Sequence, residues 1–154
     1  MKIKAEVTEI TKDDLVNLLC TATYLSNWLG IRIPKGNYTG TEFENENDCK
    51  EEKWAKVLLA GKELYAEDHY AEDMTDIYGS LPHKWCSYKN PDDGWMRYAF
   101  TLEDVKKGLG KALSEGGYPA ECANDLMNPD SADFDLNEAE LLMQYIIFGE
   151  EIYA

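Results

Sequence analysis

Basic residues are missing from the last part of this 154-residue chain. Lys111 is the last lysine or arginine, and residues 112–154 hold ten carboxylates. With 30 acidic against 15 basic residues, the formal net charge is −15. A negative field of this size repels DNA, RNA and anionic lipid and attracts positively charged surfaces. We therefore expect a basic protein as partner, with no direct nucleic-acid or membrane binding; the alternative is that the carboxylates only keep the protein in solution.

Recognisable catalytic motifs are also missing. The chain has two histidines, His69 and His83, and neither stands in a motif that would make it a general base. No GxGxxG or GxxxxGK loop is present to bind a phosphate group, and no serine or cysteine lies in a strained glycine turn. The sequence therefore predicts no catalytic residue, no enzymatic activity and no cofactor.

The four cysteines lack the paired spacing of a disulfide framework; they are Cys20, Cys49, Cys86 and Cys122. The opening sequence MKIKAEVTEI has no apolar core of a signal peptide, and no run of about 18 apolar residues is present to span a membrane. We expect free thiols in a reducing cytoplasm.

Two groupings suggest a metal, and neither is complete. His83 and Cys86 form an HxxC spacing, but structural zinc needs a second close pair of ligands. The acidic stretch 130–137 resembles a calcium loop; counted from Asp133, however, the positions that require glycine and glutamate hold other residues. We predict no metal site, with a small zinc-binding protein as an alternative.

A hydrophobic fraction of 44% is enough for one folded core, so we expect a single domain over residues 1–154. Thr11 with Asp14, and Thr101 with Asp104, have the spacing of capping boxes at helix N-termini. The last helix has Asp135 or Asn137 as its expected cap.

Alternating apolar residues predict strands, and apolar residues three and four apart predict helices. The predicted elements are strands over 2–10, 62–65 and 95–100, an extended segment over 31–33, and helices over 11 to about 28, 51–59, 101 to about 116, and 137–148. Residues 35–52 and 116–135 are predicted as acidic loops, and 67–94 show little periodicity. The pattern predicts an α+β fold, with about four helices packed on a small three- or four-stranded sheet.

Carboxylates spaced closely along a surface imitate the phosphates of a nucleic-acid duplex, which carry one charge per roughly 1.7 Å of axis. Runs of acidic residues over 42–52, 67–76 and 125–140 could form such a surface. The predicted partner-binding residues come from the last two runs: Glu67, Asp68, Glu72, Asp73, Asp76, Asp125, Asp130, Asp133, Asp135, Glu138 and Glu140. Aromatic residues within or beside the middle run are either interface anchors or core residues: Tyr70, Tyr78, Trp85, Tyr88 and Trp95.

Three segments carry a family resemblance: ITKDDLVNLLCTA with Trp28, FTLEDVKKGLGKAL, and AELLMQYIIFGEEIYA. They resemble a group of small acidic phage and prophage proteins whose function is not established, over about the first 28 and the last 60 residues. The resemblance implies a phage-encoded accessory protein made in the bacterial cytoplasm.

By analogy with such proteins, we expect an inhibitor of a host nucleic-acid-handling defence protein, similar to an anti-CRISPR protein and acting as a nucleic-acid mimic. The alternative is a phage structural or housekeeping module that forms a small homo-oligomer.

Overall fold

The computed structural model describes residues 5–34, 36–37, 47–70, 86–89, 96–128, 130 and 133–153. Within these ranges it has five helices and four strands, so the predicted α+β class is confirmed and the number of helices is one higher than expected. The elements are α1 (Lys12–Thr23), β1 (Leu29–Arg32), α2 (Lys50–Leu59), β2 (Leu64–Asp68), β3 (Ser87–Lys89), β4 (Met96–Phe100), α4 (Leu102–Glu115), α5 (Gly117–Met127) and α6 (Leu136–Phe148).

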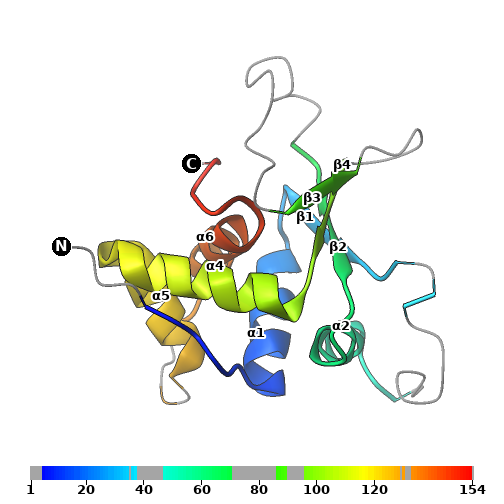
Figure 1. Cartoon of the computed structure of the whole chain (residues 1–154), viewed down its shortest axis with the longest axis horizontal. Helices are drawn as coiled ribbons and strands as arrows, with labels where there is room; N and C mark the ends of the chain where they lie inside the picture. The colour runs from blue at the N-terminus through cyan, green and yellow to red at the C-terminus, as the bar shows by residue number, and fades with distance from the viewer. Residues whose placement is uncertain are drawn as a thin grey trace.

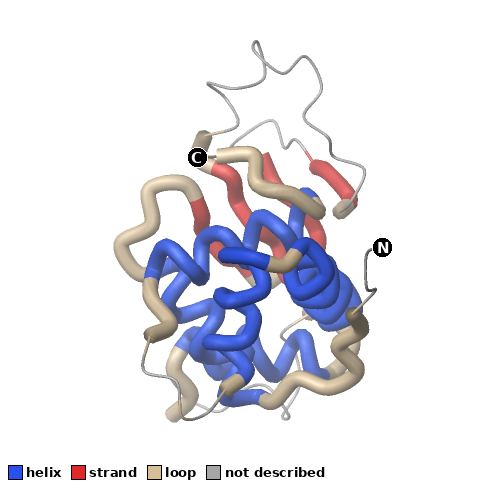
Figure 2. Tube along the Cα trace, turned by 90° about the vertical axis from the view of Figure 1, so that its left-hand side faces the viewer, coloured by secondary structure: helices blue, strands red, loops and turns tan. Residues whose placement is uncertain are grey.

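The described strands form one antiparallel sheet in the order β1-β2-β4-β3. Ala66, in the middle of β2, lies opposite Ile31 on one side and Tyr98 on the other. The sheet occupies one side of the molecule, and α1, α4, α5 and α6 are grouped beside it (Figures 1 and 2). Every helix in the described ranges is too short or too polar to span a lipid bilayer.

Helix α6 is the centre of the core and contacts α1, α4, α5 and β4. Apart from the half-buried Glu140, every residue from Glu138 to Phe148 is buried. A helix that is apolar on all sides needs partners on all sides, and α6 has them. Asp135 caps it by accepting a hydrogen bond from the Glu138 backbone N–H at 2.9 Å, as one of the two predicted caps.

Two glycines let α4 approach its neighbours closely. A Cβ atom on Gly108 would lie 2.5 Å from the Ile146 Cα, so no larger residue fits where α4 crosses α6. On Gly110, a Cβ atom would lie 2.9 Å from the Ala5 carbonyl oxygen. The N-terminal segment is held there because the Ala5 N–H donates to Ser114 Oγ at 2.9 Å.

The local signals for helix starts are confirmed. Thr11 and Asp14 form a capping box at α1, and Thr101 and Asp104 form another at α4. The predicted helices 51–59 and 137–148 and the predicted strand 95–100 agree with α2, α6 and β4. The strand predicted over 62–65 lies slightly later in the chain, as β2.

Three of the predictions are wrong: one helix boundary, one strand and one loop. The first helix ends at Thr23, well before Trp28. Residues 5–10 are extended but pair with no described strand, because they run along α4 and pack Val7 and Ile10 on the core. The loop predicted over 116–135 contains α5. Its Pro119 lies in the first turn, where the missing N–H would have had no partner within the helix in any case.

Candidate partner-binding site

The start of α6 and the adjoining α5 bring several predicted carboxylates together. Glu138 is 6% exposed, and burial raises its pKa to about 7, assisted by a hydrogen bond with Asp125 and by the charges of Asp125, Asp135 and Glu121. Two carboxyl groups this close avoid repulsion by sharing a proton. Glu138 is thus held beside Asp125 between α6 and α5, its Oε2 is buried without a hydrogen-bond partner among the described residues, and it is not available to a partner.

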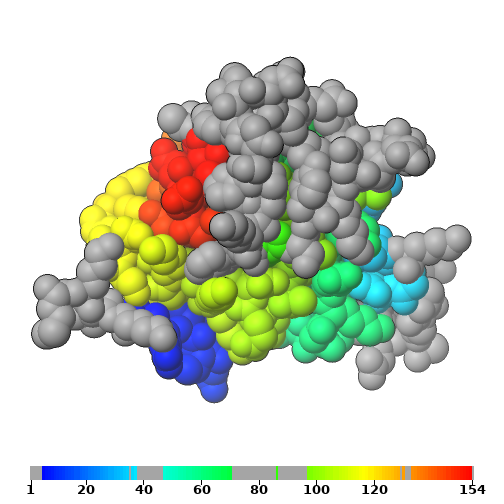
Figure 3. All heavy atoms as spheres, turned by 45° about the horizontal axis from the view of Figure 1, so that its top comes forward, coloured from blue at the N-terminus to red at the C-terminus, as the bar shows by residue number. Residues whose placement is uncertain are grey.

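The remaining carboxylates after Lys111 are exposed or half-buried. We call them the acidic face: Glu115, Glu121, Asp125, Asp130, Asp133, Asp135, Glu140, Glu150 and Glu151. Burial raises the pKa of Tyr145, and the charges of Glu115, Glu151 and Glu150 raise it further, so carboxylates also gather at the far end of α6. Helices α5 and α6 and the C-terminal segment are neighbours on the surface (yellow to red in Figure 3).

Several charges in the earlier part of the chain form ion pairs. Lys12 binds Glu52 at 3.6 Å, and Lys56 forms a short hydrogen-bonded ion pair with Asp48. Lys111, the last base, binds Glu115 at 2.9 Å. Most of the net charge of −15 comes from residues 112–154, which hold ten carboxylates and no base.

The predicted residues Glu67 and Asp68 lie inside the structure. Glu67 is 7% exposed and binds Arg32 and Arg97 through one carboxylate oxygen each, at 3.2 Å. Asp68 is 1% exposed and accepts hydrogen bonds from the Tyr70 N–H, Tyr98 Oη and Tyr153 Oη. These two carboxylates hold the sheet and the C-terminal segment together.

The other members of the middle run lie outside the described residues; they are Glu72, Asp73 and Asp76. Of the aromatic residues proposed as anchors, Tyr70 is 37% exposed at the end of β2. The side chains of Tyr78, Trp85, Tyr88 and Trp95 are not described.

A cavity of about 260 Å³ opens beside the acidic face. It lies where the turn before β1, the end of β2, α5, α6 and the C-terminal segment meet. The cavity is lined by Asn27, Trp28, Tyr70, Tyr118, Asn137, Glu140, Leu141, Gln144, Glu151 and Tyr153. No local sequence pattern indicates this cavity, because its walls come from five segments that only the fold brings together.

The wall of the cavity is held firmly. Gln144 Oε1 accepts hydrogen bonds from the N–H groups of Ile152 and Tyr153, both at 2.7 Å, and Gln144 Nε2 donates to the Tyr153 carbonyl at 3.1 Å. The Tyr153 ring lies 5.4 Å from Trp28 and 5.4 Å from Tyr70. The indole N–H of Trp28 is buried and has no acceptor among the described residues.

Exposed apolar side chains line this cavity or lie close in sequence to its lining residues. Tyr118 and Tyr70, which line it, are 49% and 37% exposed. Tyr24 and Leu25 are 69% and 76% exposed and directly precede the turn that supplies Asn27. Leu25 has a φ of 58°, a left-handed conformation that is strained for a leucine. Aromatic anchors beside charged residues are typical of protein interfaces.

The zinc alternative has little support in the described residues. Cys86 is buried and donates a hydrogen bond to the Ile146 carbonyl at 3.4 Å, and burial raises its pKa to about 12. Zinc binds thiolates, so a thiol with a raised pKa is a poor ligand. No group of three potential metal-ligating side chains occurs in the described ranges, and His83 lies outside them.

The cysteines described by the structure are all free thiols, with Cys20 and Cys49 exposed and Cys86 and Cys122 buried. Burial and the nearby charge of Glu138 raise the pKa of Cys122 to about 12. Neither buried thiol has the lowered pKa of a reactive cysteine.

Comparisons with protein-family models, with curated proteins and with solved structures find no match to this chain. The function is therefore argued from the charge, the exposed apolar residues and the cavity.

Proposed function

We propose that this protein is an acidic interaction protein that binds a basic, nucleic-acid-handling protein through its acidic face. The observation that carries the proposal is the separation of charge: nine exposed or half-buried carboxylates follow Lys111 in a stretch without a single base. A surface of this kind repels nucleic acid and attracts the basic groove that binds it.

We extend the proposal to a phage-encoded inhibitor that acts on a host defence protein in the bacterial cytoplasm. The resemblance of the helical segments to small acidic phage proteins supports this extension. The acidic face would occupy a channel built for nucleic acid, in the manner of a nucleic-acid mimic. No catalytic step is needed, because the inhibitor competes for the same surface as the nucleic acid.

A small homo-oligomer is the second candidate function, and it is favoured by the exposure of Tyr24 and Leu25. Two acidic faces repel each other, so such an oligomer would bury this apolar turn instead. Light scattering at low and high salt, with a Leu25→Glu variant, tests it. A discrete oligomer that the variant dissociates supports this candidate.

The main proposal is tested by capturing a partner from bacterial lysate and measuring its affinity at two salt concentrations. We expect affinity to fall at least tenfold between 50 and 300 mM salt, and duplex DNA to compete for the partner. The charge-reversed variant Glu121→Lys/Asp130→Lys/Asp133→Lys should bind at least tenfold more weakly.

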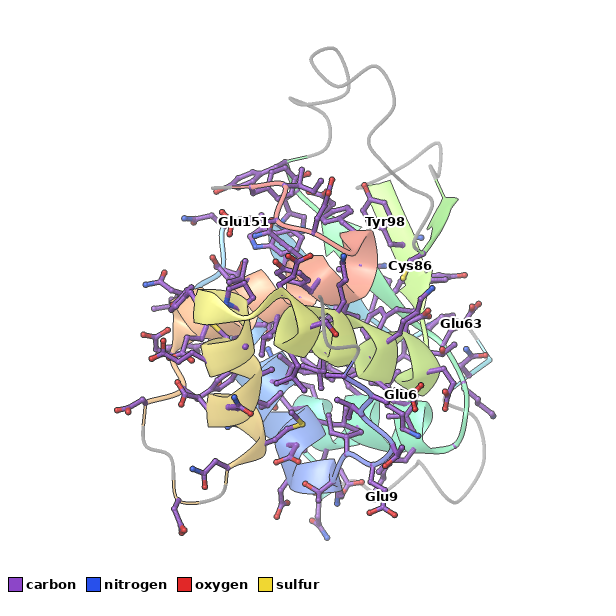
Figure 4. The ribbon with its side chains drawn as sticks, turned by 60° about the vertical axis from the view of Figure 1, so that its left-hand side comes forward. Glu6, Glu9, Glu63, Cys86, Tyr98 and Glu151 are labelled. Carbon is purple, nitrogen blue, oxygen red and sulfur yellow. The ribbon has the colours of Figure 1, made fainter. Side chains whose placement is uncertain are left out.

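The matched control changes the same charge elsewhere, with Glu6→Lys/Glu9→Lys/Glu103→Lys. These residues are exposed, and Glu9 lies at the opposite end of the molecule from Glu151 (Figure 4). The control should bind within twofold of the unchanged protein. Salt-insensitive binding, or equal loss in the two triple variants, would exclude the acidic face as the binding surface.

A further inference from the structure

The cavity beside the acidic face has the composition of a cation site. Four aromatic side chains, Trp28, Tyr70, Tyr118 and Tyr153, contribute to its wall. Two carboxylates, Glu140 and Glu151, lie in the same wall, and none of its described lining residues is basic. The faces of aromatic rings carry negative potential and attract cations, most strongly where water is displaced.

We propose that this cavity binds one arginine side chain of the basic partner. The inference rests on the proposed function for the source of the arginine. A guanidinium group stacks on aromatic faces and also binds carboxylates through its planar set of N–H donors. The cavity offers both kinds of surface. A lysine ammonium is not planar, so it would stack less well on the aromatic rings and would bind a carboxylate through fewer N–H groups.

The size of the cavity fits a side chain. Its volume of about 260 Å³ is below the roughly 300–1,000 Å³ of pockets that hold drug-sized ligands. A volume near the lower end of that range is suited to a single side chain such as that of arginine. Because Gln144 and the Asp68–Tyr153 hydrogen bond fix the C-terminal segment, the aromatic wall is formed before the ligand arrives.

The electrostatics of Glu140 agree with this assignment. Burial raises the pKa of Glu140, and a hydrogen bond with Ser26 opposes the increase. A guanidinium in the cavity would supply the missing counter-charge and stabilise the ionised carboxylate. Glu151, on the C-terminal segment that follows α6, lines the same cavity.

The test is an NMR titration that follows the Trp28 indole N–H, assigned with a Trp28→Phe variant. The probes are N-acetyl-arginine amide, its lysine counterpart, and N-acetyl-citrulline amide, which has nearly the same shape as arginine and no charge. We expect saturable shifts with the arginine probe and a Kd of about 1 mM, which corresponds to about 4 kcal/mol. The lysine probe should bind several times more weakly, and the citrulline probe should not bind.

Three variants sharpen the result: Glu140→Gln, Glu151→Gln and Tyr118→Leu, each expected to weaken the arginine probe at least threefold. Tyr118 is half exposed, so its replacement leaves the core intact. Glu121→Gln is the control, because Glu121 lies on α5 with Tyr118 but does not line the cavity; this variant should bind the arginine probe as the unchanged protein does. Equal binding of the citrulline probe, tighter binding of the lysine probe, or an unchanged Tyr118→Leu variant would overturn the proposal.

The blocked amino acids keep this test separate from that of the acidic face. A failed titration overturns the arginine cavity and leaves the salt-dependent binding of a whole partner as it was. Loss of the partner in the triple charge-reversal variant, with the arginine shifts retained, confirms that the two sites act independently.

Discussion

The acidic run that begins in strand β2 and the one in the α5–α6 region look alike in the sequence. Their carboxylates differ in what surrounds them in the fold. Glu67 and Asp68 are buried, and arginine and tyrosine side chains satisfy them. Around α5 and α6, by contrast, the stretch beyond Lys111 supplies no cation, and most carboxylates reach solvent. A run of acidic residues therefore says nothing about its role until its counter-charges are known.

The comparison separates structural acidity from acidity that is available for binding. Removing a structural carboxylate leaves a buried donor or cation without its partner, which costs free energy of unfolding. Removing an exposed carboxylate relieves some repulsion within the protein and lowers its affinity for a basic partner. Glu138 stands between the two classes, because it is buried but surrounded by like charges.

Asp68→Ala is expected to have the largest effect on stability. It removes the acceptor for the Tyr98 and Tyr153 hydroxyl groups and for the Tyr70 N–H. We expect a loss of about 3 kcal/mol, or a fall in Tm of about 6–12 °C, measured by thermal unfolding. Tyr153→Phe removes only one donor and should cost about 1 kcal/mol. An Asp68→Ala protein with unchanged Tm would show that this carboxylate is not structural.

Glu67→Gln should cost about 2 kcal/mol, less than Asp68→Ala because the site is closer to solvent. The change leaves the Arg97 guanidinium, whose side chain is 19% exposed, without its charged partner. Arg32→Gln is the matched control and should cost at most about 0.5 kcal/mol, since Arg32 is 58% exposed and Arg97 still binds Glu67. Equal costs for the two variants would contradict a structural role for the Glu67–Arg97 pair.

Glu138→Gln should stabilise the protein above neutral pH. Because the folded-state pKa of about 7 lies above the ordinary value of 4.5, the folded protein loses stability as pH rises through that interval. The shift alone implies roughly 3 kcal/mol. We expect about 1 kcal/mol at pH 7.5, because Asp125 shares the proton, and no difference below pH 4.5.

The measurement is the difference in Tm between Glu138→Gln and the unchanged protein from pH 4 to 8. Taking the difference removes the general effect of the net charge. Glu121→Gln serves as the control, since this residue is exposed and its charge contributes least among the causes that raise the pKa of Glu138. A Tm difference that stays constant with pH would contradict the carboxyl pair.

Sequence reasoning succeeded where the determinants are local. The capping boxes of α1 and α4 and the Asp135 cap of α6 depend on residues three apart, and all three agree with the structure. It failed for α5, because Gly117 and Pro119 are typical of turns and the acidic composition conceals the helix. Pro119 is accepted only because it falls in the first turn.

The candidate site was less predictable, because burial depends on the tertiary structure. The periodicity of α6 indicates a buried helix, but not that α5 would pack beside Glu138 and exclude it from solvent. Likewise, no residue close to Glu67 in the sequence predicts its ion pairs with Arg32 and Arg97, because both arginines come from neighbouring strands. The one available signal was β2 itself: alternation places Glu67 and Asp68 on opposite faces of a central strand, where charges need partners.

The smallest expected change in stability is that of Glu121→Gln/Asp130→Asn, two exposed carboxylates of the acidic face. We expect Tm to stay within about 1 °C, because both side chains are exposed and neither takes part in a hydrogen bond or ion pair within the described residues. The affinity for a nona-arginine peptide at 50 mM salt should nevertheless fall about threefold, since both charges contribute to the field that attracts it.

Glu9→Gln/Glu103→Gln is the control with the same loss of charge elsewhere on the surface. If the acidic face were simply a solvating surface, the two double variants would lose equal affinity for the peptide, since only net charge would matter. A fall in Tm of several degrees for Glu121→Gln/Asp130→Asn would instead place these residues with Glu67 and Asp68, and the distinction between the two regions would fail. Unequal peptide affinity at equal stability is the result that assigns binding to one face of the molecule.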